Sequence, residues 1–275
     1  MYNINKVINN YMIVNMDETA LFLNMSPKKT INEKGDNTIM IKTLGQEKQR
    51  ISILLSVSAE GDKLAALVVF KGKPNGKICK NLNNNLYVKQ KYLFVRCNTN
   101  GWCTKSIMND YNNDIWEPYI NKHKFDMGRA LLIFDNAPMH TGKDIENIFI
   151  NKNKRLVYIP KGLTSILQPL DIAINNLFKK GIQEKYTQYI TENNNCSKIE
   201  RNIFLNWIYE VWYSSKYITK QVIINTFKAT GISLDINGSE NGLIKSYEWA
   251  KEHMNNCFTE KEIEKNVEFN LEDRK

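Results

Sequence analysis

The chain has 275 residues, of which 42% are hydrophobic and 24% are charged, as in ordinary globular proteins. No stretch approaches the roughly 18 apolar residues of a membrane helix, and residues 1–10 lack the pattern of a secretory signal. The chain is therefore expected to be intracellular, without a membrane partner. Lys and Arg outnumber Asp and Glu by 38 to 29, and the resulting charge of +9 favours a polyanionic partner. A genome rich in A and T would also raise the Asn, Lys and Ile content, so the charge alone decides little.

Cysteine usage points to a reducing compartment. The five cysteines are odd in number and scattered, with no C-x-x-C pair and no histidines at zinc spacing: Cys79, Cys97, Cys103, Cys196 and Cys257. Free thiols explain this pattern better than disulfides or a zinc site.

The first half of the chain predicts mainly strands. Residues 11–22 read as a short apolar strand that ends at Asp17-Glu18, and the polar segment 26–39 reads as a loop. Two apolar runs in 50–72, separated by "AEGDK", predict a hairpin. Residues 86–98 hold one or two further short strands.

Helices and strands then alternate. Apolar residues at steps of four predict a helix over 104–120, and the apolar run 130–135 predicts a strand covered on both faces. A short helix over 142–152, a strand over 155–160 and a long helix over 169–190 follow. We also expect both Trp102 and Trp116 to lie in the core.

This order predicts an α/β fold with a mixed five-stranded sheet, antiparallel first and then parallel, flanked by helices. The polar break at 191–197 suggests a boundary, with a catalytic domain over 1–192 and a helical appendage over 193–258. Residues 259–275 are highly charged and are expected to form a frayed tail. Gly231 is expected to end the second appendage helix.

Three carboxylates fall at corresponding places on this framework. Asp17 and Asp135 follow apolar strands, and Asp171 opens the helix after the last strand. If the two strands are neighbours, all three side chains converge at one sheet edge. Magnesium is a hard cation that carboxylates hold well, and two such ions can clamp a phosphoryl displacement. Each aspartate alone also fits a structural role, as a turn residue or at a helix N-terminus.

Three motifs resemble the DDE-superfamily transposases of the pogo/Tigger group, which are related to mariner transposases and to centromere protein B. They are "MDETALFLNMSPKKT" (16–30), "LLIFDNAPMH" (131–140) and "LTSILQPLDIAINNLFK" (163–179). With weaker echoes between them, the resemblance covers about residues 12–190.

The resemblance implies an RNase H-like fold and metal-dependent DNA endonuclease and strand-transfer activity. Asp17, Asp135 and Asp171 would be both the catalytic triad and the ligands of two Mg²⁺ or Mn²⁺ ions. Asn136, His140 and Gln168 would orient ligands or substrate, although His140 could equally be a packing residue. The lysines expected to contact DNA phosphates are Lys71, Lys73, Lys161, Lys179 and Lys180.

The sequence also departs from the family. Members usually carry helix-turn-helix regions ahead of the catalytic domain, and Asp17 lies too near the start of this chain to leave room for one. A truncated copy or a domesticated DNA-binding protein without transposition activity is therefore the alternative. Further expected features are a nuclear location and, as partners besides DNA, either a second copy of the chain or a separate DNA-binding subunit.

Overall fold

The computed structural model describes residues 9–23, 50–123, 129–136, 142–150, 153–193, 198–235 and 237–244. These residues fall into two compact units, one that extends to Thr226 and one that begins at Phe227. Within the described residues, no helix combines the length and apolar composition that a membrane span requires. The predicted loop 26–39 and the tail 259–275 both lie entirely outside the described residues.

A six-stranded mixed sheet forms the centre of the first unit. Its strands are β1 (Ile13–Phe22), β2 (Arg50–Ser58), β3 (Ala66–Lys71), β4 (Leu93–Asn98), β5 (Ala130–Asp135) and β6 (Lys154–Ile159). The order across the sheet is β4-β3-β2-β1-β5-β6, and β2 alone runs antiparallel to its neighbours. The carboxyl ends of the other five strands therefore share one edge.

The α/β prediction is confirmed, with one strand more than expected. β4 pairs in parallel with β3 from Leu93 to Asn98, and so extends the sheet beyond the predicted five strands. β4 buries alternate side chains, which is the pattern of a strand with one covered face.

The described helical segments are η1 (Asn10–Met12), α1 (Lys77–Leu82), α2 (Leu86–Lys89), α3 (Lys105–Tyr111), η2 (Asn112–Trp116), α4 (Glu117–Lys122), α5 (Lys143–Phe149), α6 (Thr164–Leu167), η3 (Leu170–Ile174), α7 (Asn175–Glu192), α8 (Arg201–Tyr213), α9 (Lys220–Ala229) and η4 (Asn241–Leu243). The three helices predicted between residues 104 and 190 are confirmed. Gly231 adopts φ +76°, the left-handed conformation expected just after a helix.

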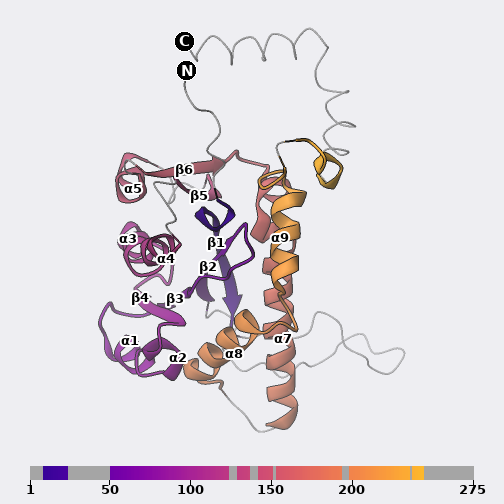
Figure 1. The fold of residues 1–275 in the computed structure, drawn as a ribbon. Helices are drawn as coiled ribbons and strands as arrows, with labels where there is room; N and C mark the ends of the chain where they lie inside the picture. Colours follow the sequence, from indigo (N-terminus) through magenta and orange to yellow (C-terminus); the bar gives the residue numbers. More distant parts are fainter. Residues whose placement is uncertain are drawn as a thin grey trace. The chain divides into compact units, whose positions relative to one another are not determined.

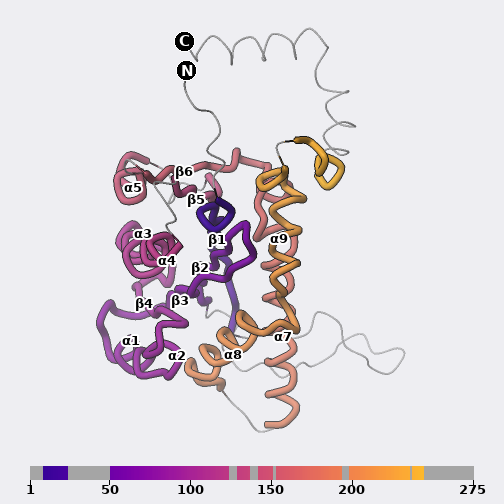
Figure 2. The backbone as a smooth tube through the Cα atoms, viewed as in Figure 1, coloured from indigo at the N-terminus to yellow at the C-terminus, as the bar shows by residue number. Residues whose placement is uncertain are grey.

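One face of the sheet carries the main apolar core. Val14 and Met16 on β1 are fully buried there, together with Trp116 of η2 and Phe149 of α5. Figures 1 and 2 show α3, α4 and α5 gathered on this side of the sheet and α7 on the other. The prediction for Trp102 is wrong: its side chain is 52% exposed, with the Arg50 guanidinium 5.7 Å from the ring centroid.

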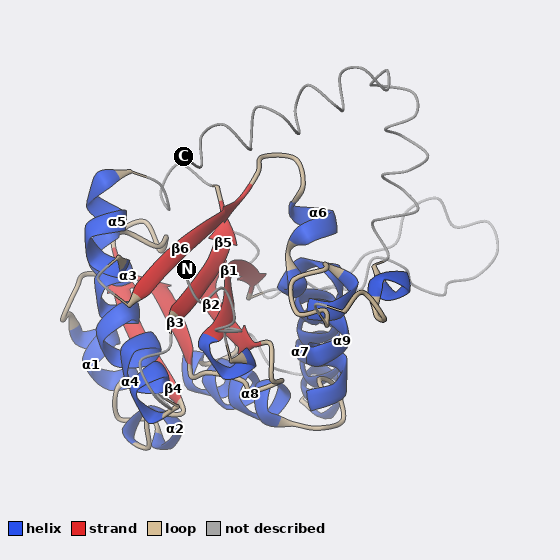
Figure 3. Ribbon diagram, turned by 45° about the horizontal axis from the view of Figure 1, so that its top comes forward, coloured by secondary structure: helices blue, strands red, loops and turns tan. Residues whose placement is uncertain are grey.

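The opposite face is covered by α7 and α8 (Figure 3). Trp212 of α8 donates its indole N–H to the Leu64 carbonyl at 2.9 Å and packs edge-on against Phe178 of α7. Lys63 donates to the Trp212 carbonyl at 2.6 Å. These contacts attach α8 to the β2–β3 connection, so the compact unit continues past residue 192. The division into a catalytic domain and a helical appendage stays a prediction.

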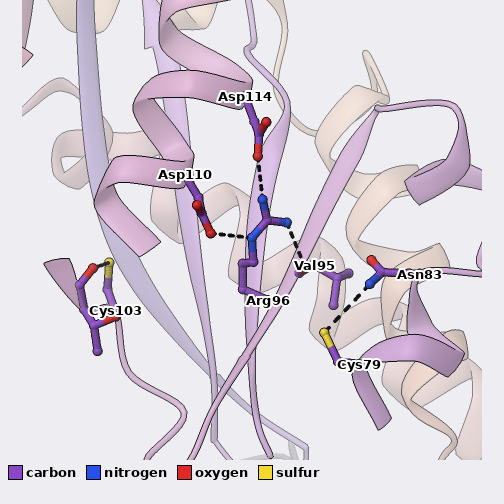
Figure 4. Close-up of polar contacts among 8 residues, drawn as sticks. Cys79, Asn83, Val95, Arg96, Cys103, Asp110 and Asp114 are labelled. Atoms are coloured by element: carbon purple, nitrogen blue, oxygen red, sulfur yellow. Dashed lines mark hydrogen bonds and ion pairs between the residues drawn. The ribbon is translucent and has the colours of Figure 1, made fainter. Parts of the chain in front are cut away.

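A charged cluster fixes the edge strand β4 (Figure 4). The Arg96 guanidinium donates to Asp110 at 2.6 Å and to Asp114 at 2.5 Å, and its third contact is the Val95 carbonyl at 3.1 Å. All three side chains are partly exposed, so each ion pair contributes little by itself. Together they connect α3, through Asp110, and η2, through Asp114, to the edge strand β4.

Gly181 provides a test of the packing between α7 and α8. A Cβ at this position would lie 2.6 Å from Val211 Cγ1 and 3.1 Å from the Tyr217 ring. Ala normally favours a helix over Gly by about 1 kcal/mol, but overpacking costs about 1–3 kcal/mol. We expect Gly181→Ala to lower the unfolding free energy in a denaturant titration. Gln183→Ala, at an exposed position of α7, is the control and should change little; equal stability of both variants with wild type would contradict the close approach.

Candidate active site

The central strand β1 carries polar side chains at positions that are buried. Asn15 is fully buried, Asp17 is 8% exposed and Thr19 is 3% exposed. These residues alternate with Val14 and Met16, so they share the face opposite the apolar core. The predicted strand end at Asp17 is wrong, because β1 continues to pair with β2 as far as Phe22. Asp17 thus lies in the middle of a central strand, where an unsatisfied polar group is costly.

The Asn15 side chain joins the three elements that carry the predicted aspartates. Its Nδ2 donates to the Ile133 carbonyl of β5 at 3.0 Å, and its Oδ1 accepts from the Leu170 N–H of η3 at 3.0 Å. Asn15 precedes Asp17 by two residues, Ile133 precedes Asp135 by two, and Leu170 precedes Asp171 by one. One buried amide therefore sets the spacing of all three carboxylates.

Strand register places Asp17 level with Asp135. β1 and β5 pair in parallel from Ile13↔Leu131 to Asn15↔Ile133. The same register, carried two residues further, sets the two aspartates side by side on one face. Asp135 ends β5 and is partly exposed.

A π-helical turn presents the third aspartate. In η3 the Asn175 N–H bonds to the Leu170 carbonyl, five residues back, and the wider turn leads directly into α7. Such turns recur at functional sites, because the added residue redirects side chains. Asn175 donates its Nδ2 both to Asp17 Oδ2 at 2.6 Å and to Asp171 Oδ1 at 2.9 Å. Asp17 and Asp171 are thereby held on either side of one amide.

The surroundings of Asp17 oppose its ionisation. Burial is the largest cause, and the neighbouring Asp171 and then Asp135 add like-charge repulsion; together they raise the pKa of Asp17 to about 7. The hydrogen bond from Asn175 acts in the opposite direction. The negative charge of this cluster is thus only partly compensated by the protein.

The three residues predicted to orient ligands or substrate differ in where the structure places them. Gln168 is fully buried beside Asp17, where a hydrogen bond from its side chain lowers the pKa of that carboxyl, while its Oε1 has no hydrogen-bond partner. Asn136 directly follows Asp135 and is partly buried, whereas His140 lies outside the described residues. The orienting roles predicted for Asn136 and His140 are not tested by these positions.

The five predicted DNA-contacting lysines are all exposed. Lys71 ends β3 and Lys73 follows it, while Lys161 follows β6, so these three lie at the sheet edge where β5 ends. Lys179 and Lys180 lie on α7, about two turns beyond Asp171.

Asn15 and Asn175 were not anticipated from the sequence. In a chain rich in Asn, a single Asn carries little information. The available signal was position: Asn15 interrupts an apolar strand two residues before an aspartate, and Asn175 follows Asp171 at the i+4 spacing of helix neighbours.

The donor set suits a hard divalent cation. Carboxylate and amide oxygens are the ligands that Mg²⁺ and Mn²⁺ take from proteins, and a cation would relieve the repulsion at Asp17. The buried Oε1 of Gln168, which has no hydrogen-bond partner, adds a further oxygen at this place. Across the described part of the chain, no three Asp, Glu, His or Cys side chains are already arranged to hold a metal ion. The three aspartates thus provide suitable donors that have still to close around a cation.

Comparisons with known proteins give a consistent result. A family model described as "DDE superfamily endonuclease" matches residues 48–227. "Pogo transposable element with KRAB domain" from Mus musculus is 28% identical over 231 residues, which cover 81% of this chain and 35% of that protein. The Homo sapiens protein of the same name is 27% identical, with 83% and 36% covered. The chain therefore spans about a third of the length of these relatives.

The fold also has a counterpart among solved structures. The crystal structure of the Mos1 strand transfer complex matches with a TM-score of 0.50 at 12% identity, covering 80% of this chain and 52% of the Mos1 chain. At this identity the match concerns the fold alone, and it supports the predicted RNase H-like architecture.

Removal of the Asn15 amide should loosen the site. In Asn15→Ala the Leu170 N–H loses its partner, so we expect the unfolding free energy to fall by about 1–3 kcal/mol. Mn²⁺ affinity, measured by calorimetry, should fall as well, because the three elements are no longer joined. Asn176→Ala, an exposed neighbour on α7, is the control. If the two variants behave alike, Asn15 does not organise the site.

The raised pKa of Asp17 predicts an unusual pH dependence for the metal-free protein. The folded-state pKa of about 7 exceeds the reference value of 3.8, so between these values unfolding releases a proton. The contribution of Asp17 to the unfolding free energy is fully present below about pH 4. It is lost as the pH rises through 7, and the total loss is about 4 kcal/mol.

The measurement is the unfolding free energy with chelator present, from pH 4.5 to 8.5, for wild type and Asp17→Asn. We expect the variant to gain stability relative to wild type as the pH rises. Parallel pH profiles would show that Asp17 ionises normally in the folded state.

Proposed function

The chain belongs to the DDE superfamily endonucleases, and from this premise we propose that it is a metal-dependent enzyme that cleaves DNA and transfers the freed end to another DNA site. The observation that supports the proposal is the contact of Asp17 and Asp171 with one buried Asn175 amide, together with the like-charge effect of Asp135 on Asp17. A chain selected for stability alone would gain nothing from three carboxylates at this place.

We assign Asp17, Asp135 and Asp171 to the binding of two Mg²⁺ or Mn²⁺ ions. When bound, such a pair activates the attacking oxygen and stabilises the leaving oxygen of a phosphodiester. The chain's own contribution is to hold the three carboxylates on rigid elements, with Gln168 and Asn136 as orienting groups. In the first reaction water would attack a phosphorus and displace the 3′ oxygen, which gives a free 3′-hydroxyl and a 5′-phosphate. In the second that 3′-hydroxyl would attack a phosphorus of the target DNA and displace the 3′ oxygen of the target strand.

The DNA backbone is the proposed ligand of the exposed lysines. Lys71, Lys73 and Lys161 share an edge of the sheet with Asp135, and a net charge of +9 favours binding that weakens as salt rises. Such contacts fix the register of DNA but read no sequence. We therefore propose a separate DNA-binding subunit as a source of sequence recognition, a second copy of the chain as the alternative partner, and the nucleus as the place where the protein acts.

Nicking of a supercoiled plasmid in Mg²⁺ or Mn²⁺ tests this function. We expect wild type to nick, and Asp17→Asn, Asp135→Asn and Asp171→Asn each to lose at least about 100-fold in rate, the size typical of a lost electrostatic contact to the transition state. Asp144→Asn is the matched control, because this carboxylate on α5 is 74% exposed and forms an ion pair with Lys105 at 2.8 Å.

Metal binding by the same proteins separates the alternatives. DNA binding without nicking, together with no thermal stabilisation by Mn²⁺, would favour a domesticated or truncated DNA-binding protein that kept the fold. Nicking that survives the loss of any of the three aspartates would contradict the proposed active site.

A further inference from the structure

The Asn175 side chain occupies the position that a positive charge would be expected to fill. Its Nδ2 lies 2.6 Å from Asp17 Oδ2 and 2.9 Å from Asp171 Oδ1, and the residue is 5% exposed. Ionised carboxylates only accept hydrogen bonds, so the nitrogen of the amide has to face them. The partial positive charge of this NH₂ group therefore separates two like charges in the metal-free protein.

The other end of the same amide is not satisfied. Asn175 Oδ1 is buried and has no hydrogen-bond partner. A buried carbonyl without a donor is destabilising, and native structures carry few of them. The torsion that would exchange Oδ1 and Nδ2 is broad and roughly two-fold, so rotation of the amide is not hindered by the torsion itself. With the amide turned, its oxygen would face two carboxylates, which is favourable only if a cation lies among them.

We propose that Asn175 is a switchable ligand: its nitrogen holds Asp17 and Asp171 together in the metal-free protein, and its oxygen coordinates the divalent cation when one is bound. The inference rests on the metal site of the proposed function and adds a residue to it. An amide oxygen is an accepted ligand of hard cations. It is also neutral, so it contributes a donor without adding to the repulsion that already raises the energy of this cluster.

A second observation points to the same place. Gln168 is fully buried beside Asp17, where a hydrogen bond from its side chain favours the ionised carboxylate, and its Oε1 has no hydrogen-bond partner. Two buried amides with unused oxygens thus lie next to the same carboxylate. An arrangement completed within the protein would have satisfied these atoms, whereas an arrangement that awaits a cation leaves them available.

Calorimetric titration of the whole chain with Mn²⁺ tests the proposal. We expect Asn175→Leu to weaken Mn²⁺ binding at least tenfold, because a ligand is lost. We expect Asn175→Asp to bind Mn²⁺ at least as tightly as wild type, and to melt at a lower temperature without metal, because a fourth carboxylate then joins Asp17, Asp135 and Asp171. Asn176→Leu makes the same substitution at the exposed neighbouring position and should match wild type in both measurements.

If Asn175 only separates the carboxylates, its amide nitrogen competes with the metal for their oxygens. Removal of the side chain then removes this competition. Asn175→Leu would then bind Mn²⁺ as well as or better than wild type, and the inference would be wrong while the proposed function stood. If wild type binds neither Mn²⁺ nor Mg²⁺, both fail together.

The wild-type protein offers a direct measurement that needs no folded variant of Asn175. In ¹⁵N-labelled protein we expect the NMR signals of the two side-chain amide protons of Asn175 to shift strongly on addition of Mg²⁺. The reason is that rotation of the amide breaks their hydrogen bonds to the two carboxylates. Saturation with Mg²⁺ that leaves these signals in place would overturn the amide rotation.

Discussion

The arrangement of the site depends on the two hydrogen bonds of the Asn15 amide. They connect a central strand, its parallel neighbour and the start of a helix, which are three elements far apart in the sequence. Because β1 and β5 pair over only a few residues, the sheet ladder by itself would position Asp17 and Asp135 weakly. The amide adds a side-chain connection at the last paired position, immediately before the carboxylates. It also satisfies the first N–H of η3, so the helix that bears Asp171 begins at a fixed point.

This arrangement destabilises the ionised form of Asp17. Its carboxyl is buried on a central strand beside two other carboxylates, and the raised pKa expresses how unfavourable the ionised form is without a cation. The Asn175 side-chain N–H groups offset part of the repulsion, but the side-chain oxygen of Asn175 is left buried without a hydrogen-bond partner. On the other face of the sheet apolar side chains form the core, and at the edge strand Arg96 is matched by two acids. A buried carboxylate beside two further carboxylates departs from this pattern, and such departures are typical of functional sites.

The sequence was sufficient for the framework, because apolar runs and turn residues act locally, while the role of the three aspartates stays a prediction. It failed where pairing between distant segments decides. Asp17-Glu18 looks like a strand end, but pairing with β2 carries β1 on to Phe22. Trp102 was assigned to the core on size alone, yet it follows the edge strand β4 and stays exposed. Asn15 and Asn175 acquire meaning only once β1, β5 and η3 are adjacent, which no local pattern reveals.

The most direct test of the central claim is diffraction from crystals grown with Mn²⁺, with data collected for anomalous scattering. The account predicts anomalous density among the carboxylates of Asp17, Asp135 and Asp171, with the Asn175 oxygen directed towards it. Crystals saturated with Mn²⁺ that show no density at these side chains, or density only at surface carboxylates, would contradict the assignment of this cluster as a metal site.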